Sequence, residues 1–213
     1  MTTIINLMPY YSLATNGVIH VGANVGEEVD LYANNGIKHG IYIEPIPEIY
    51  SRLEENCRKY SKHTPINALV SNRNGETIEF NISTNSGQSS SIFEFGTHLD
   101  SHPQVGYSKK LSLATTTLDS LLAENFTTES LSVFDSLVID TQGAELKVLE
   151  GARLILRQIK FAMIEVSDEE VYKGGALFSD VECFMEEQGF SLVHLFINHY
   201  NWGDGFFVRN EFL

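Results

Sequence analysis

Apolar runs and stretches with helical periodicity alternate along the chain. Residues 17–21 form an apolar run that ends at a glycine, and residues 27–35 follow with helical spacing and stop at Gly36. The same order returns in residues 41–44 and 47–60. Because parallel strands must be joined by connections long enough to hold a helix, this repetition predicts a parallel sheet with crossover helices.

The middle of the chain is less regular. Residues 66–70 are predicted to form a third short strand, and the Asn74-Gly75 turn followed by alternation over 77–82 predicts a hairpin. Residues 83–110 are rich in Ser, Gly, Asn and His and show no periodicity. A loop of this length inside a domain is usually functional or disordered, so we interpret it as a lid or substrate loop.

The remaining residues return to short strands and helices. The predicted strands are 111–115, as an edge strand, 136–140, 161–166, 191–196 and 205–209, and the predicted helices are 117–124, 144–150 and 180–188. We therefore predict a single α/β domain over residues 1–213, with helices on both faces of a mostly parallel sheet.

Composition narrows the class of protein. With 213 residues, 43% hydrophobic and only 20% charged, the chain can bury the core of one domain. The formal net charge is −14, from 28 acidic and 14 basic side chains, so most of the surface should repel a phosphate backbone. We expect no nucleic-acid partner.

The cysteines and the N-terminal residues suggest no metal site, disulfide or membrane segment. Cys57 and Cys183 have no partner at metal-ligand spacing, which argues against a zinc site and a disulfide scaffold. The first fifteen residues lack Lys, Arg and a sustained apolar run, and we find no membrane-spanning stretch. We expect a cytoplasmic protein with no membrane partner.

Glycines and a carboxylate follow the first two predicted strands. In a parallel sheet, ligands gather at the carboxyl ends of the strands. Gly22 and Gly26 allow a tight turn there, although such glycines alone are often only turn chemistry. Glu44 ends the next strand, where an acidic side chain can accept both hydroxyls of a ribose. Asn24 stands where a dinucleotide-binding motif has its middle glycine, which argues against NAD.

Three motifs together resemble the FkbM-type methyltransferase family. They are VIHVGANVGEE at 18–28, YIEPIP at 42–47 and LVIDTQGAE at 137–145. The resemblance implies a Rossmann-like class I methyltransferase domain, with a seven-stranded sheet whose last strand is antiparallel. It also implies S-adenosylmethionine as the cofactor and a hydroxyl on a small molecule or sugar as the methyl acceptor.

The resemblance also implies a set of cofactor-binding residues. The glycine turn would face the methionine part, Glu44 the ribose, residues 68–70 the adenine and Asp140 the amino group. The full set is His20, Gly22, Ala23, Asn24, Gly26, Glu44, Pro45, Ala68, Leu69, Ser90, Asp140 and Gln142.

Two of these residues depart from the family pattern. His20 occupies a position where many members have Asp, and Gln142 one where many have Glu. A histidine in an apolar strand is usually buried with its hydrogen bonds satisfied, although the place of His20 just before the turn also permits a bond to the cofactor. Gln142 lacks the charge that a catalytic base would need.

Methyl transfer to a hydroxyl requires alignment and removal of the acceptor proton. Our candidates for the base are Asp140, Glu165 and His98, although Glu165 could be a structural carboxylate and His98 a plain loop histidine. Asp140 and Glu165 could also hold a divalent cation, but no third ligand is evident, so we expect no metal.

Two other functions remain compatible with the sequence. One is a non-catalytic nucleoside-binding or scaffold protein with the same fold, and the other is an NAD-dependent oxidoreductase. The sequence indicates neither the identity of the acceptor nor the oligomeric state.

Overall fold

Seven strands form the central sheet of the computed structural model, which describes residues 3–213. In spatial order they are β3 (His63–Ile66), β2 (His39–Ile43), β1 (Gly17–Val21), β7 (Ser136–Ile139), β8 (Phe161–Ser167), β10 (Trp202–Arg209) and β9 (Phe190–Ile197). The first five run parallel, and β10 runs antiparallel to both β8 and β9. The predicted mostly parallel sheet with an antiparallel last strand is confirmed.

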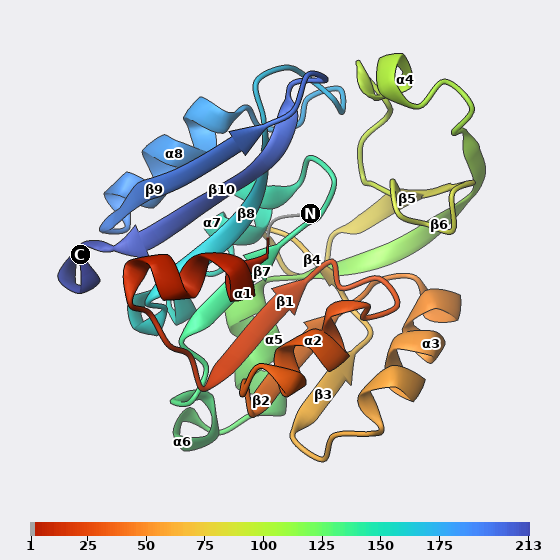
Figure 1. The fold of residues 1–213 in the computed structure, drawn as a ribbon. Helices are drawn as coiled ribbons and strands as arrows, with labels where there is room; N and C mark the ends of the chain where they lie inside the picture. Colours follow the sequence, from red (N-terminus) through yellow and green to blue (C-terminus); the bar gives the residue numbers. More distant parts are fainter. Residues whose placement is uncertain (1–2) are drawn as a thin grey trace.

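Helices cover both faces of this sheet because successive strand residues point to opposite sides. Val18 and Val138 pack under α1 (Ile4–Leu7), α2 (Glu28–Asn34) and α3 (Pro47–Cys57). Ile19 and Leu137 pack under α5 (Leu118–Asn125), α7 (Glu145–Glu150) and α8 (Phe178–Glu187). Figure 1 shows the first three helices in front of the sheet and the other three behind it. The predicted arrangement of helices on both faces is thus confirmed.

Local signals explain where the longer helices lie. The helix α3 begins at Pro47 and buries Ile49, Leu53 and Cys57 along one face. The side chain of Thr117 accepts a hydrogen bond from the Ser120 amide and caps α5. Shorter helical turns that the pattern did not predict are η1 (Met8–Tyr11), α4 (His98–Ser101), α6 (Thr128–Leu131), η2 (Ile155–Gln158) and η3 (Asn210–Phe212). Among residues 3–213, no helix has the length and apolarity needed to cross a bilayer.

A second, three-stranded sheet corrects our prediction for the middle of the chain. It consists of β4 (Leu69–Val70), β6 (Tyr107–Thr116) and β5 (Thr77–Ser83), in that spatial order. The predicted strand 66–70 is wrong, because the main-sheet strand β3 ends where that prediction begins and β4 pairs with β6 instead.

The predicted hairpin over 66–82 is also wrong, as is the assignment of 111–115 to a sheet edge. Strand β5 pairs antiparallel with β6, which is the central strand of the small sheet. The Asn74-Gly75 turn is held by Thr115, whose carbonyl accepts from the Gly75 amide at 2.8 Å and whose amide donates to the Glu76 carbonyl at 2.8 Å. The turn therefore docks on β6 and does not fold β5 back onto β4.

The segment 83–106 is ordered by polar contacts. The Ser83 amide donates to Ser90 Oγ at 3.0 Å, and the Ser89 amide donates to Ser83 Oγ at 3.1 Å. Ser91 Oγ donates to the Gln142 carbonyl at 2.7 Å and ties the segment to the main sheet. Because side chains satisfy the backbone here, the sequence has no periodic pattern even though the chain is folded.

Candidate active site

A cavity of about 330 Å³ opens at the carboxyl edge of the main sheet, beside the small sheet and the segment 83–106. It brings together eleven of the twelve predicted cofactor-binding residues: His20, Gly22, Ala23, Asn24, Glu44, Pro45, Ala68, Leu69, Ser90, Asp140 and Gln142. The three candidate bases, Asp140, Glu165 and His98, also line it. Gly26 does not line the cavity. It packs against Leu53 of α3, and a Cβ added at Gly26 would lie 2.6 Å from Leu53 Cδ1.

The turn after β1 requires its first glycine for a packing reason. At Gly22, φ is +83°, and a Cβ would lie 1.7 Å from the Asp140 carbonyl oxygen. The absence of a side chain lets the tip of β1 touch the tip of β7 directly. This contact brings the turn against Asp140, the residue that follows β7.

The backbone amides of residues 22–26 all donate within the protein. Gly22 and Ala23 both donate to the Ile43 carbonyl, and Gly26 donates to the Ala23 carbonyl. The Val25 amide donates to the side chain of Asn24. A pyrophosphate needs free amides at such a turn, so this geometry disfavours a dinucleotide ligand.

Glu44 connects the turn to β2. It is only 4% exposed, and it accepts the Asn24 amide at 3.1 Å on one oxygen and the Ile46 amide at 2.8 Å on the other. Burial raises the pKa of Glu44 to about 7, against the opposing effect of these two hydrogen bonds. Each carboxylate oxygen keeps a second lone pair, so the side chain can also accept hydroxyl groups from a ligand.

Gln142 links the two candidate carboxylates. Its Nε2 donates to Asp140 Oδ1 at 2.6 Å and to Glu165 Oε2 at 2.8 Å, while its Oε1 accepts from the Tyr172 hydroxyl. Burial raises the pKa of Glu165 well above its usual range, and the neighbouring Asp140 raises it further. Burial therefore favours the protonated form of this pair.

This arrangement differs from a metal site. The amide nitrogen of Gln142 is a donor and lies between Asp140 and Glu165, where a cation shared by the two carboxylates would have to lie. Within residues 3–213, no group of three or more potential ligands is placed to hold a metal ion.

His98 lies on α4 and points into the cavity, where it is 5% exposed. Its Nε2 is 2.9 Å from Ser89 Oγ, which already accepts a hydrogen bond from Asn85 Nδ2. The Ser89 hydroxyl can therefore donate to His98. The ring stacks on Phe95 at 4.4 Å, and burial lowers the pKa of His98 to about 4. His98 is thus a neutral imidazole at physiological pH.

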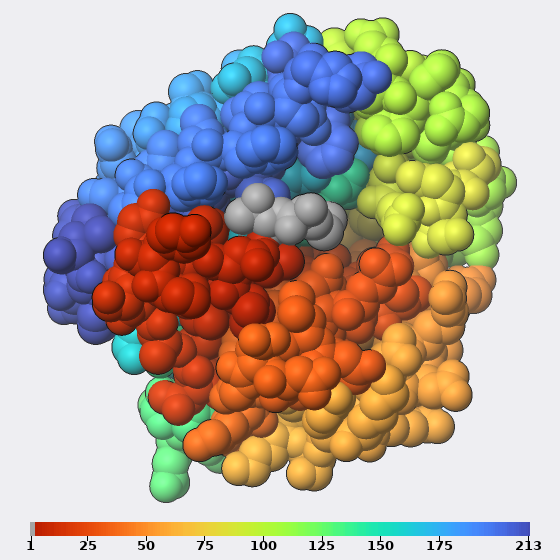
Figure 2. Space-filling model, in the orientation of Figure 1, coloured from red at the N-terminus to blue at the C-terminus, as the bar shows by residue number. Residues whose placement is uncertain are grey.

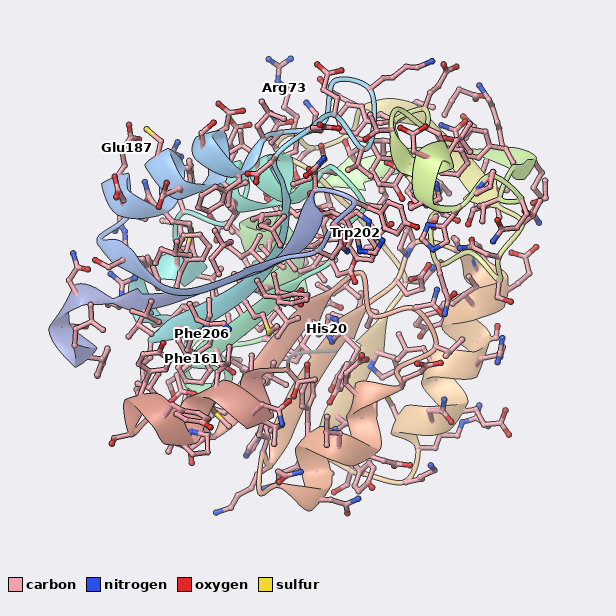
Figure 3. The ribbon with its side chains drawn as sticks, turned by 45° about the horizontal axis from the view of Figure 1, so that its top comes forward. His20, Arg73, Phe161, Glu187, Trp202 and Phe206 are labelled. Carbon is pink, nitrogen blue, oxygen red and sulfur yellow. The ribbon has the colours of Figure 1, made fainter. Side chains whose placement is uncertain are left out.

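His20 is buried, as predicted, but one of its ring nitrogens is not satisfied. Its Nδ1 has no hydrogen-bond partner among residues 3–213, and the ring packs beside Tyr32 and Tyr42, with ring centroids 6.1 and 6.4 Å away. Burial lowers the pKa of His20, so the ring is neutral. Figure 3 shows His20 on β1, and the residue lines the cavity. An unpaired buried nitrogen beside a cavity suits a hydrogen bond to a bound ligand.

Three further residues at the site were not singled out by the sequence. Glu145 is buried and accepts the amides of Thr141 and Gly143 at 2.8 and 3.2 Å. Its place at the start of a predicted helix was the available signal, because a carboxylate there can bond to free amides. Trp202 reaches the cavity from the start of β10 (Figure 3), Tyr172 lines it from a loop, and no local pattern marks either residue.

Comparison with known proteins identifies the family of this chain. A family model described as the methyltransferase FkbM domain matches residues 20–192. The chain belongs to the FkbM methyltransferase family. It is similar to the 2-O-methyltransferase NoeI of Sinorhizobium fredii, with 28% identity over 164 residues that cover 74% of this chain and 65% of NoeI. The chain thus spans slightly less than two thirds of this relative.

Solved structures show the same fold at low identity. Magnesium protoporphyrin IX methyltransferase ChlM from Synechocystis, with bound S-adenosylmethionine, has a TM-score of 0.50 and 9% identity, covering 95% of this chain and 74% of ChlM. TrmK from M. capricolum, in complex with S-adenosylhomocysteine, has a TM-score of 0.51 and 11% identity, covering 99% and 69%. The resemblance inferred from the three motifs is confirmed at the level of family and fold.

Proposed function

We propose that this FkbM-family methyltransferase transfers the methyl group of S-adenosylmethionine to a hydroxyl group of a small molecule or sugar. The observation that carries the proposal is the convergence of the glycine turn, Glu44 and the Asp140–Gln142–Glu165 cluster on one cavity. The family match and the 2-O-methyltransferase relative support it. The bound cofactors of ChlM and TrmK support the choice of methyl donor.

The residues present fit this cofactor. Glu44 would accept the ribose hydroxyls, and the apolar side chains of Ala68 and Leu69 would lie against the adenine. The unpaired Nδ1 of the neutral His20 would find its missing partner on the cofactor. Asp140 would face the cationic amino and sulfonium groups, which favour its ionised form.

The bound cofactor supplies an electrophilic methyl group on a sulfonium sulfur, so the protein must align the acceptor and remove its proton. Burial and the neighbouring Asp140 favour the protonated form of Glu165, and Asp140 accepts a hydrogen bond from Gln142. We therefore assign the base to His98, whose Nε2 lies 2.9 Å from Ser89 Oγ and would accept from the acceptor hydroxyl in place of the Ser89 hydroxyl. The acceptor oxygen forms a bond to the methyl carbon as the carbon–sulfur bond breaks, and the hydroxyl proton passes to His98.

Calorimetric titration with S-adenosylmethionine tests the first half of the proposal. We expect saturable heat at one site per chain, undiminished by excess NAD because the turn offers no free amide to a pyrophosphate. An absence of heat, or displacement by NAD, would contradict the proposal.

Transfer of tritiated methyl groups to a panel of hydroxylated acceptors tests the second half. Turnover distinguishes the enzyme from a nucleoside-binding scaffold of the same fold, which would bind the cofactor and label nothing. As a control, Asp140→Ala should abolish both binding and labelling.

A further inference from the structure

The wall of the cavity is rich in carboxylates and poor in cations. Six acidic residues line it: Glu27, Glu28, Glu44, Asp140, Glu145 and Glu165. Among the lining residues that the structure describes there is neither a lysine nor an arginine. The positive groups of S-adenosylmethionine would meet some of these carboxylates, but neither a lysine nor an arginine is present for an acceptor.

Two lysines on neighbouring elements are already paired. Lys109 on β6 lies 2.6 Å from Glu48, and Lys173, next to the cavity residue Tyr172, lies 3.6 Å from Glu94. The amides of the glycine turn, which could otherwise hold an anion, donate within the protein. The site therefore lacks lysine, arginine and free amides in the glycine turn, which are three of the groups by which proteins bind a phosphate.

Other lining residues suit an uncharged ligand with several hydroxyls. Tyr172 and Trp202 supply aromatic surface, and Asn85, Ser89 and His98 supply polar atoms. In Figure 2 the segment 83–106, in yellow-green, meets the blue β9–β10 hairpin at one end of the molecule. Trp202 from that hairpin packs against the cluster formed by Phe95, Val105, Val171 and Tyr172. The acceptor side of the cavity is thus walled by aromatic and neutral polar groups.

We infer that the acceptor is an uncharged alcohol, such as the sugar of a neutral glycoside, and that phosphorylated and nucleotide-activated sugars are excluded. This inference rests on the proposed function. If the acceptor is a sugar, the methyl group is added only after a glycosyl transfer has released the nucleoside diphosphate from that sugar. A phosphorylated acceptor would bring up to two negative charges beside buried acidic side chains, with no lysine or arginine to offset them.

Paired acceptors test the inference. The protein is given tritiated S-adenosylmethionine with the methyl glycosides of a set of sugars, and separately with the 1-phosphates and nucleoside-diphosphate derivatives of the same sugars. Labelled products are sorted by anion exchange. We expect kcat/KM for the neutral acceptors to be about 100-fold higher than for the anionic acceptors. Equal or greater labelling of the anionic series overturns the inference and leaves the methyltransferase proposal intact.

If neither series is labelled although calorimetry shows cofactor binding, the hydroxyl-acceptor proposal fails and the inference with it. If the cofactor does not bind, the proposed function itself fails. These two results are distinct from labelling of the anionic series, so failure of the inference can be told from failure of the function.

A single added cation gives an independent test. Gln88 is exposed and lines the cavity, so Gln88→Arg would place a guanidinium at its rim without disturbing the fold. We expect the preference for neutral acceptors to fall by about tenfold in this variant and to stay unchanged in the uncharged control Gln88→Leu. If Gln88→Arg leaves the preference for neutral acceptors unchanged, charge does not determine that preference.

Discussion

Gln142 has left-handed backbone geometry, with φ at +56°, and this turns its amide between two acidic side chains. A glutamine has both a donor and an acceptor, so one side chain can join Asp140, Glu165 and Tyr172. The sequence singled out Gln142 only because it lacks a charge. The structure shows that its donor group is the property that matters here.

The variant Gln142→Ala should shift the pH dependence of cofactor binding. The hydrogen bond from Gln142 lowers the pKa of Asp140 against the effect of burial, so its removal raises that pKa. Asp140 would then be protonated at higher pH. The loss of S-adenosylmethionine affinity on acidification would therefore begin at a higher pH, so that the acidic limb of the affinity–pH curve shifts upward in pH. Calorimetry between pH 5 and 8 measures this. An acidic limb at the same pH as in the unsubstituted protein would contradict the assigned role.

His98→Gln tests the proposed base. Loss of general-base catalysis typically costs a factor of about 100 to 10,000 in kcat, while cofactor affinity should not change because His98 faces the acceptor side. His102→Gln is the matched control, because His102 stacks on His98 at 5.1 Å but does not contact Ser89 in the hydrogen-bond network of the described residues. Equal losses in the two variants would favour a structural role for the histidine pair.

The placement of the candidate site residues could be predicted where they follow a strand of the main sheet. Gly22, Glu44 and Asp140 all lie beyond the ends of buried apolar runs, and the parallel topology brings such ends together. Tyr172 and Trp202 could not be predicted in this way. Their contacts depend on tertiary packing between segments that are far apart in the sequence.

At the scale of elements, prediction succeeded for the main sheet apart from its edge strand β3, and it failed for the small sheet. Strands β1, β2, β7 and β8 are buried on both faces and therefore read as continuous apolar runs. Strand β6 is exposed or partly exposed over most of its length, so only its last half showed a pattern. Its register is fixed by long-range pairing, which a local pattern does not contain.

The docking of α4 depends on a glycine. A Cβ at Gly96 would lie 1.9 Å from the Glu170 carbonyl oxygen, and the Gly96 amide donates to the Val171 carbonyl at 2.8 Å. We expect Gly96→Ala to displace α4 and His98 from the cavity, raising KM for the acceptor by about tenfold or more and leaving cofactor affinity unchanged. Gly106→Ala is the control, since no atom lies within 4 Å of its added Cβ and its φ is not positive. Steady-state kinetics with a varied acceptor would reveal the difference, and normal kinetics for Gly96→Ala would contradict it.

For the whole molecule, the buried carboxylates set how stability changes with pH. Burial raises the pKa of Glu44 and Glu145 to about 7, above their usual values near 4.5. The folded state then holds more protons than the unfolded state between those values. The stability that protonation gives is complete below about pH 4.5 and is lost as the pH rises through 7.

The cofactor-free protein should therefore become less stable between pH 5 and 7.5. The expected slope is about 1.4 kcal/mol per pH unit for each such carboxyl group, and His98, whose pKa burial lowers to about 4, offsets one such group below about pH 6.5. Urea unfolding at a series of pH values measures it, and Glu44→Gln should flatten the slope because it removes one titrating group. A free energy of unfolding that rises over this range would contradict the assigned burial of charge.

The small sheet comes from one uninterrupted stretch of chain, residues 69–116, that leaves the main sheet after β3 and returns before α5. It contacts the rest of the domain through apolar side chains, among them Leu69, Phe80 and Ile82, which pack on Val25 and Ile49 beside the glycine turn, and through the hydrogen bond from Ser91 to the Gln142 carbonyl. A stretch with two neighbouring ends can be exchanged as a unit if its contacts with the rest of the domain are kept. Grafting the corresponding stretch of a relative, with these contacts and the proposed cofactor-binding residues Leu69 and Ser90 retained, would change the choice of acceptor.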